Sequence, residues 1–151
     1  MYSTGLLTLN QVLPLRSLVL REGKLPPDQC VNEGDEHPDT FHTGCFSEDQ
    51  VYSIATFMRE DYPGYTGEGF RLRGMAVLPN LQGQGLGKQA LQFGIARLKA
   101  SGINYLWCNA RKVAYDFYTG QDFIILSDEF DIPGIGPHKV MMLSLEESKH
   151  E

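Results

Sequence analysis

The sequence has little cysteine and no long apolar run, and each shortage excludes a class of protein. Its three cysteines, Cys30, Cys45 and Cys108, are far apart and form no CxxC pair. We therefore expect neither a disulfide framework nor a zinc site, and no bound metal. No segment approaches the roughly 20 apolar residues of a membrane-spanning helix, and the N-terminus lacks the basic leader of a signal peptide. We expect no membrane partner and a reducing cytoplasm.

An excess of positive charge is also absent. The chain has 13 Lys and Arg residues against 19 Asp and Glu residues, which gives a net charge of −6. Nucleic-acid binders usually present a basic surface, so no nucleic-acid partner is expected, and −6 is an ordinary charge for solubility. With 151 residues, 42% of them hydrophobic and 21% charged, the chain is typical of a globular protein with a single domain, residues 1–151.

Periodic apolar positions predict a mixed α/β fold. Helices are expected at residues 11–22, from the end of a glycine-rich loop to about residue 100, and at 112–119. Strands are expected at 41–46, 51–60, 70–79, 103–109, 123–127 and 139–145. Strands and helices alternate after an antiparallel hairpin, which indicates a mixed sheet flanked by helices.

The first predicted helix is followed by a long loop. Asn10 can cap this helix, Gly23 can end it, and Pro14 is tolerated because it would lie in the first turn. Residues 24–40 are rich in prolines, acids and turn-forming residues, which predicts a loop of the length that often carries function. Asp35 and Asp39 in this loop either face a cationic substrate or belong to a solvated acidic surface.

The stretch LQGQGLGKQAL, residues 81–91, places glycines at every second position from residue 83 to residue 87. Glycines this dense allow backbone amides to approach a ligand, usually a phosphate. A Walker A loop is disfavoured, because Gln82 stands where its first glycine should be and Gln89 where its hydroxyl should be. A dinucleotide fingerprint is disfavoured too, because Lys88 replaces its third glycine and no acid follows about 20 residues later.

A third interpretation fits the stretch. Residues 82–87, QGQGLG, follow the pattern Q/R-x-x-G-x-G/A between a strand and a helix. This resembles the acyl-CoA pyrophosphate loop of the GNAT superfamily of N-acetyltransferases. Free amides at a helix N-terminus favour an anion, and glycines remove the Cβ atoms that would hold a diphosphate away. The alternative is a glycine-rich turn with no ligand.

A second segment, residues 109–123, resembles the next part of the same superfamily. The family segment contains A-x-x-F-Y-x-x-x-G-F, and Ala114, Phe117, Tyr118 and Phe123 match it in register. Asp122 departs from it, because the family usually has glycine there; Gly120 is the alternative residue for that turn. The resemblance covers about residues 70–145.

The resemblance implies a mostly antiparallel central sheet flanked by helices. Two parallel strands, residues 70–78 and 103–109, would splay apart and admit the pantetheine arm of acetyl-CoA. Backbone groups near the end of the first strand would pair with the pantetheine amides, the loop amides would hold the pyrophosphate, and two residues further along would contact the cofactor. The implied cofactor-binding residues are Met75, Ala76, Val77, Gln82, Gly83, Gln84, Gly85, Leu86, Gly87, Lys88, Asn109 and Phe117.

The resemblance also implies a general acid. When an amine attacks a thioester, a thiolate is expelled, and a phenol within reach of the sulfur can donate a proton. The resemblance places Tyr118 there; the alternative is a core tyrosine with a satisfied hydroxyl. The base that deprotonates the amine is not identified by the sequence. His138, beside a turn-rich loop, is our preferred residue, and the other candidates are His42, Glu60 and Asp61.

These residues together predict an N-acetyltransferase. The acetyl group of acetyl-CoA would pass to a primary amine of a small molecule or peptide by direct attack in a ternary complex. The acceptor would be held by residues 24–40, 61–69 and 128–138, the parts least similar to the family, so the sequence does not identify it. The alternative function is a non-catalytic CoA-binding or sensing module. A homodimer is a further expectation, for which the sequence shows no interface.

Overall fold

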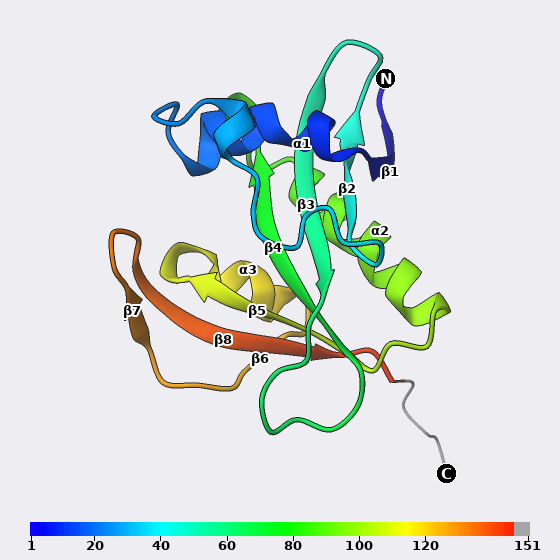
Figure 1. Ribbon diagram of the computed structural model, residues 1–151, viewed down its shortest axis with the longest axis vertical. Coiled ribbons are helices and arrows are strands. Elements are labelled where there is room, and N and C mark those ends of the chain that lie inside the picture. The colour runs from blue at the N-terminus through cyan, green and yellow to red at the C-terminus, as the bar shows by residue number, and fades with distance from the viewer. Residues whose placement is uncertain (147–151) are drawn as a thin grey trace. The chain divides into compact units, whose positions relative to one another are not determined.

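The computed structural model describes residues 1–146, which form two compact units (Figure 1). The first unit contains Met1–Arg59 and Leu72–Leu98, and the second contains Glu60–Arg71 and the chain from Lys99 onward. The prediction of a single domain stays a prediction. Among the described residues, no helix is long and apolar enough to cross a membrane, and no group of His, Cys, Asp and Glu side chains is arranged to hold a metal ion.

The first unit is an antiparallel sheet with helices. Strands β1, β2 and β3 pair in antiparallel order, and β4 follows β3 in the sheet. The elements of this unit, in chain order, are β1 (Ser3–Leu7), α1 (Leu9–Leu15), the π-helical turn η1 (Arg16–Leu20), the 3-10 turn η2 (Pro27–Gln29), β2 (Phe41–Phe46), β3 (Val51–Arg59), most of β4 (Gly69–Val77), the 3-10 turn η3 (Pro79–Leu81) and α2 (Leu86–Ala100).

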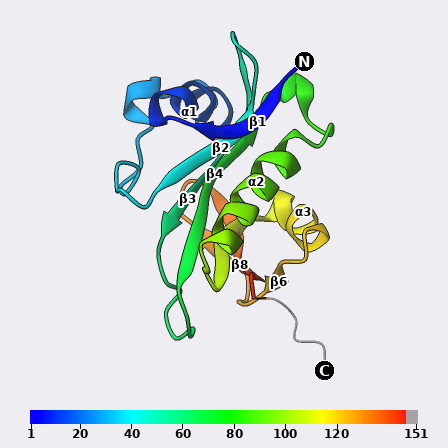
Figure 2. The same ribbon diagram turned by 90° about the vertical axis from the view of Figure 1, so that its right-hand side faces the viewer.

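Helices α1 and α2 cover opposite faces of the sheet in the first unit (Figure 2). Side chains alternate between the two faces of a strand, so neighbouring residues of β3 meet different helices. Ile54 packs in a core cluster with residues of α1, whereas the Phe57 ring lies against Gly94 of α2. A Cβ atom on Gly94 would lie within 2.1 Å of that ring, so glycine is required for the close approach of helix and strand.

The first helix begins earlier than predicted. Thr8 is its N-cap: the Gln11 amide donates to the Thr8 hydroxyl, and the Gln11 side chain accepts from the Thr8 amide. This capping box satisfies two amides that a helix start would otherwise leave unpaired, so the helix begins at Leu9. The predicted cap at Asn10 is therefore wrong. Pro14 lies beyond the first turn, also contrary to prediction, and the chain changes to the π-helical turn two residues later.

The second unit is built on the first residues of β4. Gly69–Arg71 pair in parallel with Tyr105–Trp107 of β5, and β5 pairs antiparallel with β8, which also pairs with β6 and β7. The elements are β5 (Tyr105–Arg111), the 3-10 turn η4 (Lys112–Ala114), α3 (Tyr115–Gly120), β6 (Ile124–Ile125), β7 (Phe130–Ile132) and β8 (Gly136–Ser144).

Strand β4 therefore contributes to both units. The hydrogen-bonded order of the strands is β1-β2-β3-β4-β5-β8-β6, with β7 paired to β8. This sheet is mostly antiparallel, contains the parallel β4–β5 pair and is accompanied by helices. The predicted fold class is confirmed. The short strands β1 and β7 were not predicted.

Candidate functional site

The glycine-rich loop in the first unit has the backbone that a bound anion requires. Gly83 and Gly85 both have φ of +82°, a conformation that side chains disfavour. A Cβ atom built on either residue would meet nothing within 4 Å, so backbone conformation, and not crowding, requires these glycines. Helix α2 begins at Leu86, and Gln89 donates back to the Gly85 carbonyl. The amides before Gln89 thus belong to the first turn, whose N–H groups have no partner within the helix.

Glycine is needed at residue 87 for a different reason than at the two loop positions. It is buried in the first turn of α2, and a Cβ atom there would lie 3.2 Å from Val77 and 3.7 Å from Met75. The glycine therefore lets the start of α2 pack closely on the end of β4. Ala76, between these two strand residues, points to the core cluster under α1. The side chains of residues 75–77 are thus in or beside the core, so the predicted cofactor contacts would have to use their main chain.

Buried hydroxyl groups fix the start of α2 to the sheet. The Ser53 hydroxyl donates to the Leu86 carbonyl at 2.9 Å, and the Thr43 hydroxyl donates to the Ala90 carbonyl at 2.7 Å. Both hydroxyls come from strands of the first unit and are fully buried. Each such hydrogen bond contributes about 1 kcal/mol and holds the helix at a defined height on the sheet. The loop that precedes α2 is therefore held in place from its C-terminal side.

The predicted acid, Tyr118, lies in the short helix α3 of the second unit. The helix ends in a Schellman motif, in which the Phe123 amide donates to the Tyr118 carbonyl and the Asp122 amide donates to the Thr119 carbonyl. Asp122 has φ of +70°. It therefore occupies the left-handed position itself, although the family usually has glycine there, and the alternative that Gly120 makes this turn is wrong. The Tyr118 and Phe123 rings lie 5.1 Å apart.

The Tyr118 hydroxyl is buried and hydrogen-bonds the thiol of Cys108 on β5. Burial raises the pKa of Tyr118 well above its usual value, and the neighbouring thiol raises it further. Burial also raises the pKa of Cys108 to about 12. Both groups therefore keep their protons at neutral pH, as a proton donor must. Cys108 is buried and neutral, as predicted for a small core residue, and not a nucleophile.

His138 lies on β8 and is almost fully buried. Its Nδ1 atom is 2.7 Å from the Gly136 carbonyl, and its ring stacks on Phe130 at 6.1 Å. A carbonyl only accepts, so Nδ1 carries a proton and donates it to the Gly136 carbonyl. In the β5–β8 ladder Cys108 pairs with Met141, so these two side chains lie on the same face. Met141 and His138 are three residues apart on β8, so His138 lies on the other face. Tyr118, which contacts Cys108, and His138 are therefore on opposite faces of this ladder.

The remaining predicted residues of the second unit are half-buried or engaged elsewhere. Phe117 packs edge-on against the Tyr118 ring at 5.3 Å. Asn109 is half-buried on β5 and, one residue from Cys108, lies on the face opposite Tyr118. Glu60 lies 3.6 Å from Arg71, and Asp61 accepts the Gly69 amide at 2.8 Å. Hydrogen bonding between β4 and β5 covers three residue pairs, and the predicted splaying of these strands beyond them stays a prediction.

A buried polar cluster in the first unit was not predicted. Arg16 donates to both carboxylate oxygens of Asp35, at 2.6 and 2.8 Å, to the Cys30 carbonyl at 3.0 Å and to the Thr56 hydroxyl at 2.8 Å. Thr56 also contacts His42 at 2.7 Å. Asp35 is therefore neither solvated nor available to a substrate, contrary to prediction, and His42 is a structural histidine. A sign was present in the sequence: Arg16 lies in the apolar stripe of the first helix.

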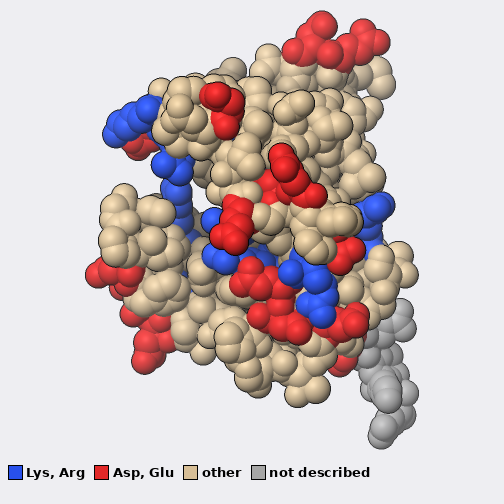
Figure 3. Space-filling view, viewed as in Figure 1, with Lys and Arg blue, Asp and Glu red and all other residues tan. Residues whose placement is uncertain are grey.

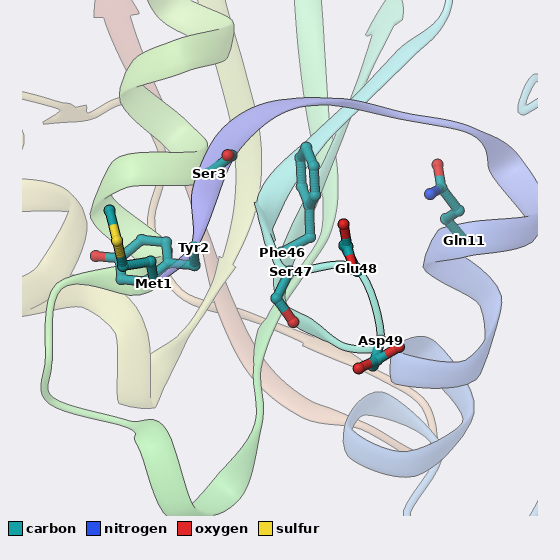
Figure 4. A pocket seen from close by; sticks show the side chains of 8 residues that line it. All are labelled: Met1, Tyr2, Ser3, Gln11, Phe46, Ser47, Glu48 and Asp49. Carbon is teal, nitrogen blue, oxygen red and sulfur yellow. The ribbon is translucent and has the colours of Figure 1, made fainter.

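A separate cavity of about 670 Å³ lies beside β1 and the β2–β3 turn (Figure 4). Acidic side chains gather at the tip of this hairpin (Figure 3). The cavity contains none of the predicted site residues; one of its residues, Tyr2, bonds Gln89 of α2. Its lining consists of Met1, Tyr2, Ser3, Gln11, Phe46, Ser47, Glu48 and Asp49.

Comparison with known proteins gives a consistent result. Residues 13–123 match the sequence model of the Acetyltransferase (GNAT) family. The chain is 36% identical over 123 residues to the uncharacterised N-acetyltransferase YitI of Bacillus subtilis (strain 168), which covers 81% of this chain and 83% of that protein.

Solved structures share the fold at low sequence identity. The crystal structure of Escherichia coli ElaA aligns with a TM-score of 0.76 at 19% identity, over 94% of this chain and 99% of that one. An aminoglycoside 6'-N-acetyltransferase complexed with coenzyme A aligns with a TM-score of 0.76 at 11% identity, over 98% and 99% of the two chains.

Proposed function

The chain belongs to the acetyltransferase (GNAT) family, and from this membership we propose that it transfers an acetyl group to a primary amine of a small molecule or peptide by direct attack in a ternary complex. Membership makes it an acyltransferase that uses acetyl-CoA, which sets aside the alternative of a non-catalytic CoA-binding module. The acceptor, the cytoplasmic location, the absence of a nucleic-acid partner and the homodimer remain proposals.

The observation that carries the proposal is the loop before α2. Two glycines with φ of +82° and open space beside them lead directly into a helix N-terminus. This backbone fits a diphosphate, because amides and the positive end of the helix dipole face a ligand that no Cβ atom keeps away. We assign the amides of residues 82–88 to the pyrophosphate and the main chain of residues 75–77 to the pantetheine, with Asn109 and Phe117 as further contacts.

Acetyl-CoA supplies the acetyl group as an activated thioester. Tyr118 keeps its proton until a thiolate develops, and its hydroxyl already hydrogen-bonds a sulfur atom in Cys108. His138, through Nε2, is the proposed acceptor of the amine proton.

Thermal unfolding with acetyl-CoA, CoA and Mg-ATP in parallel tests the proposal. At 100 times its dissociation constant a ligand stabilises a protein by about 2.7 kcal/mol, which raises Tm by roughly 5–10 °C for a chain of this size. We expect this rise with both CoA compounds and none with Mg-ATP. An amine panel with colorimetric detection of released CoA then tests transfer.

A matched pair of glycine variants tests whether the rise in Tm comes from CoA binding at the loop. Gly85→Ala places a side chain in the proposed pyrophosphate site at φ +82°, and Gly102→Ala places one at φ +76° in similarly open space after α2. Gly85→Ala should abolish the rise with CoA, and Gly102→Ala should keep it. Equal rises in both variants would remove the pyrophosphate assignment, and no rise in the wild-type protein would remove CoA binding.

A further inference from the structure

The hydrogen bonds around Arg16 connect residues from four segments of the first unit. Arginine only donates, so the Thr56 oxygen accepts from Arg16, and the same hydroxyl hydrogen-bonds Nδ1 of His42 at 2.7 Å. His42 also hydrogen-bonds the main chain of Asp35. Asp35 in turn accepts from Arg16 and from the Asn32 amide. These hydrogen bonds connect the four residues in a closed ring, which the main chain of Asp35 completes.

The ring also touches strand β4. Gly74 has φ of +62° inside the strand, and a Cβ atom there would lie 3.2 Å from Nε of Arg16. The guanidinium therefore fills the space under this irregular point of the strand. Nε of Arg16 is buried and has no hydrogen-bond partner in the part of the chain that the structure describes. Directly after Gly74 come Met75–Val77, whose main chain we assign to the pantetheine.

We propose that this ring of Arg16, Asp35, His42 and Thr56 positions the main chain of Met75–Val77 for the transfer reaction. The inference rests on the proposed function. Arg16 reaches β4 at Gly74, while its partners hold it from the 24–40 loop and from β2 and β3. All four are buried and none is among the residues that we assign to acetyl-CoA, so each is proposed as a positioning residue. The proposal predicts that a broken ring weakens the cofactor contacts of β4 but not those of the loop before α2. The reason is that the start of α2 is fixed separately by Ser53 and Thr43.

Thr56 offers the sharpest test, since it is uncharged and buried. Thr56→Val keeps the shape but removes the hydroxyl that links Arg16 to His42, and Thr56→Ser is the matched control that keeps it. Hydrogen exchange is measured with and without acetyl-CoA, and kcat is measured with the best amine of the panel. Thr56→Val should lose protection by acetyl-CoA at residues 75–77 roughly tenfold, keep it at residues 82–88, and show a similar fall in kcat.

The outcomes separate this inference from the proposed function. Equal protection at residues 75–77 and equal kcat in Thr56→Val and Thr56→Ser would overturn the positioning role. An absence of protection at residues 82–88 in the wild-type protein would overturn the proposed function and this inference with it. If Thr56→Val does not fold, Gly74→Ala displaces Arg16 from the side of β4 and should give the same loss at residues 75–77; unchanged protection there would again reject the role.

Discussion

The Tyr118 hydroxyl is buried beside the Cys108 thiol, and the environment of each group favours its neutral form. Desolvation is the larger cause in both, because a phenolate or thiolate in this apolar region would lose its hydration. A hydroxyl that is protonated over the whole physiological pH range is suited to donate to a thiolate as it forms. Burial and the neighbouring thiol thus both suppress ionisation of Tyr118, the residue that we propose as the acid.

Replacement of Tyr118 by Phe should lower kcat by about 10²-fold, the usual loss when a general acid is removed. The Kd of acetyl-CoA, measured by calorimetry, should change little, because the ring and its packing on Phe123 remain. Tyr115→Phe is the matched control, since Tyr115 is in the same helix but bonds Glu129 at the surface. Similar turnover in both variants and in the wild type would exclude the acid role.

At the scale of single residues, the sequence identified candidate side chains where they belong to a local pattern of residues. Tyr118 was identified by a pattern of ten residues. Arg16 and Asp35 were not paired by any pattern, because they lie 19 residues apart and meet only when the loop folds back on the first helix. From sequence alone, an acidic residue in a polar loop is expected to be solvated, because its buried partner is not evident.

At the scale of elements, the C-terminus of α3 shows how a turn tolerates an unusual residue. The left-handed position of a Schellman motif normally takes glycine, since a Cβ atom is unfavourable there. Aspartate adopts this conformation more readily than most residues, which explains why Asp122 can hold φ of +70° and still let Phe123 bond the Tyr118 carbonyl. The turn that supports the proposed acid is therefore strained but intact.

Asp122→Gly should raise the free energy of unfolding by about 1 kcal/mol, because glycine removes the cost of the left-handed conformation. Asp122→Val, with a branched side chain, should lower it. Urea denaturation of the wild-type protein and both variants measures the differences. A decrease in Asp122→Gly would show that the Asp122 side chain stabilises the turn by more than the backbone strain costs.

At the scale of the whole molecule, the buried ring links stability to pH. The pKa of His42 is lowered, chiefly by burial and then by the Arg16 charge, so the unfolded chain binds this proton more readily than the folded protein. Burial alone would raise the pKa of Asp35, but the Arg16 and Asn32 hydrogen bonds and the Arg16 charge outweigh it and lower the pKa. Both groups therefore lower the free energy of unfolding as pH falls. His42 does so from about pH 6.5 downward, and Asp35 does so below about pH 4.

Wild-type protein should lose stability between pH 7.5 and pH 5, by at most about 1.4 kcal/mol per pH unit for the single His42 proton. His42→Gln should flatten this part of the curve, because glutamine does not titrate. His37→Gln, at an exposed histidine, serves as the control and should follow the wild type. Urea unfolding at half-unit pH steps measures the slopes. A His42→Gln slope equal to that of the wild type would contradict the assignment.

The sequence by itself determined the fold class and the loop before α2. Their signals are local: glycines that permit positive φ, a helix N-terminus that follows at once, and alternating apolar residues in the strands. The tertiary structure alone decided the Arg16–Asp35 ring, the contact of Arg16 with Gly74, the Tyr118–Cys108 pair and the opposite faces of Tyr118 and His138. These depend on which distant segments meet in the folded chain and in which register, and a local pattern does not encode that.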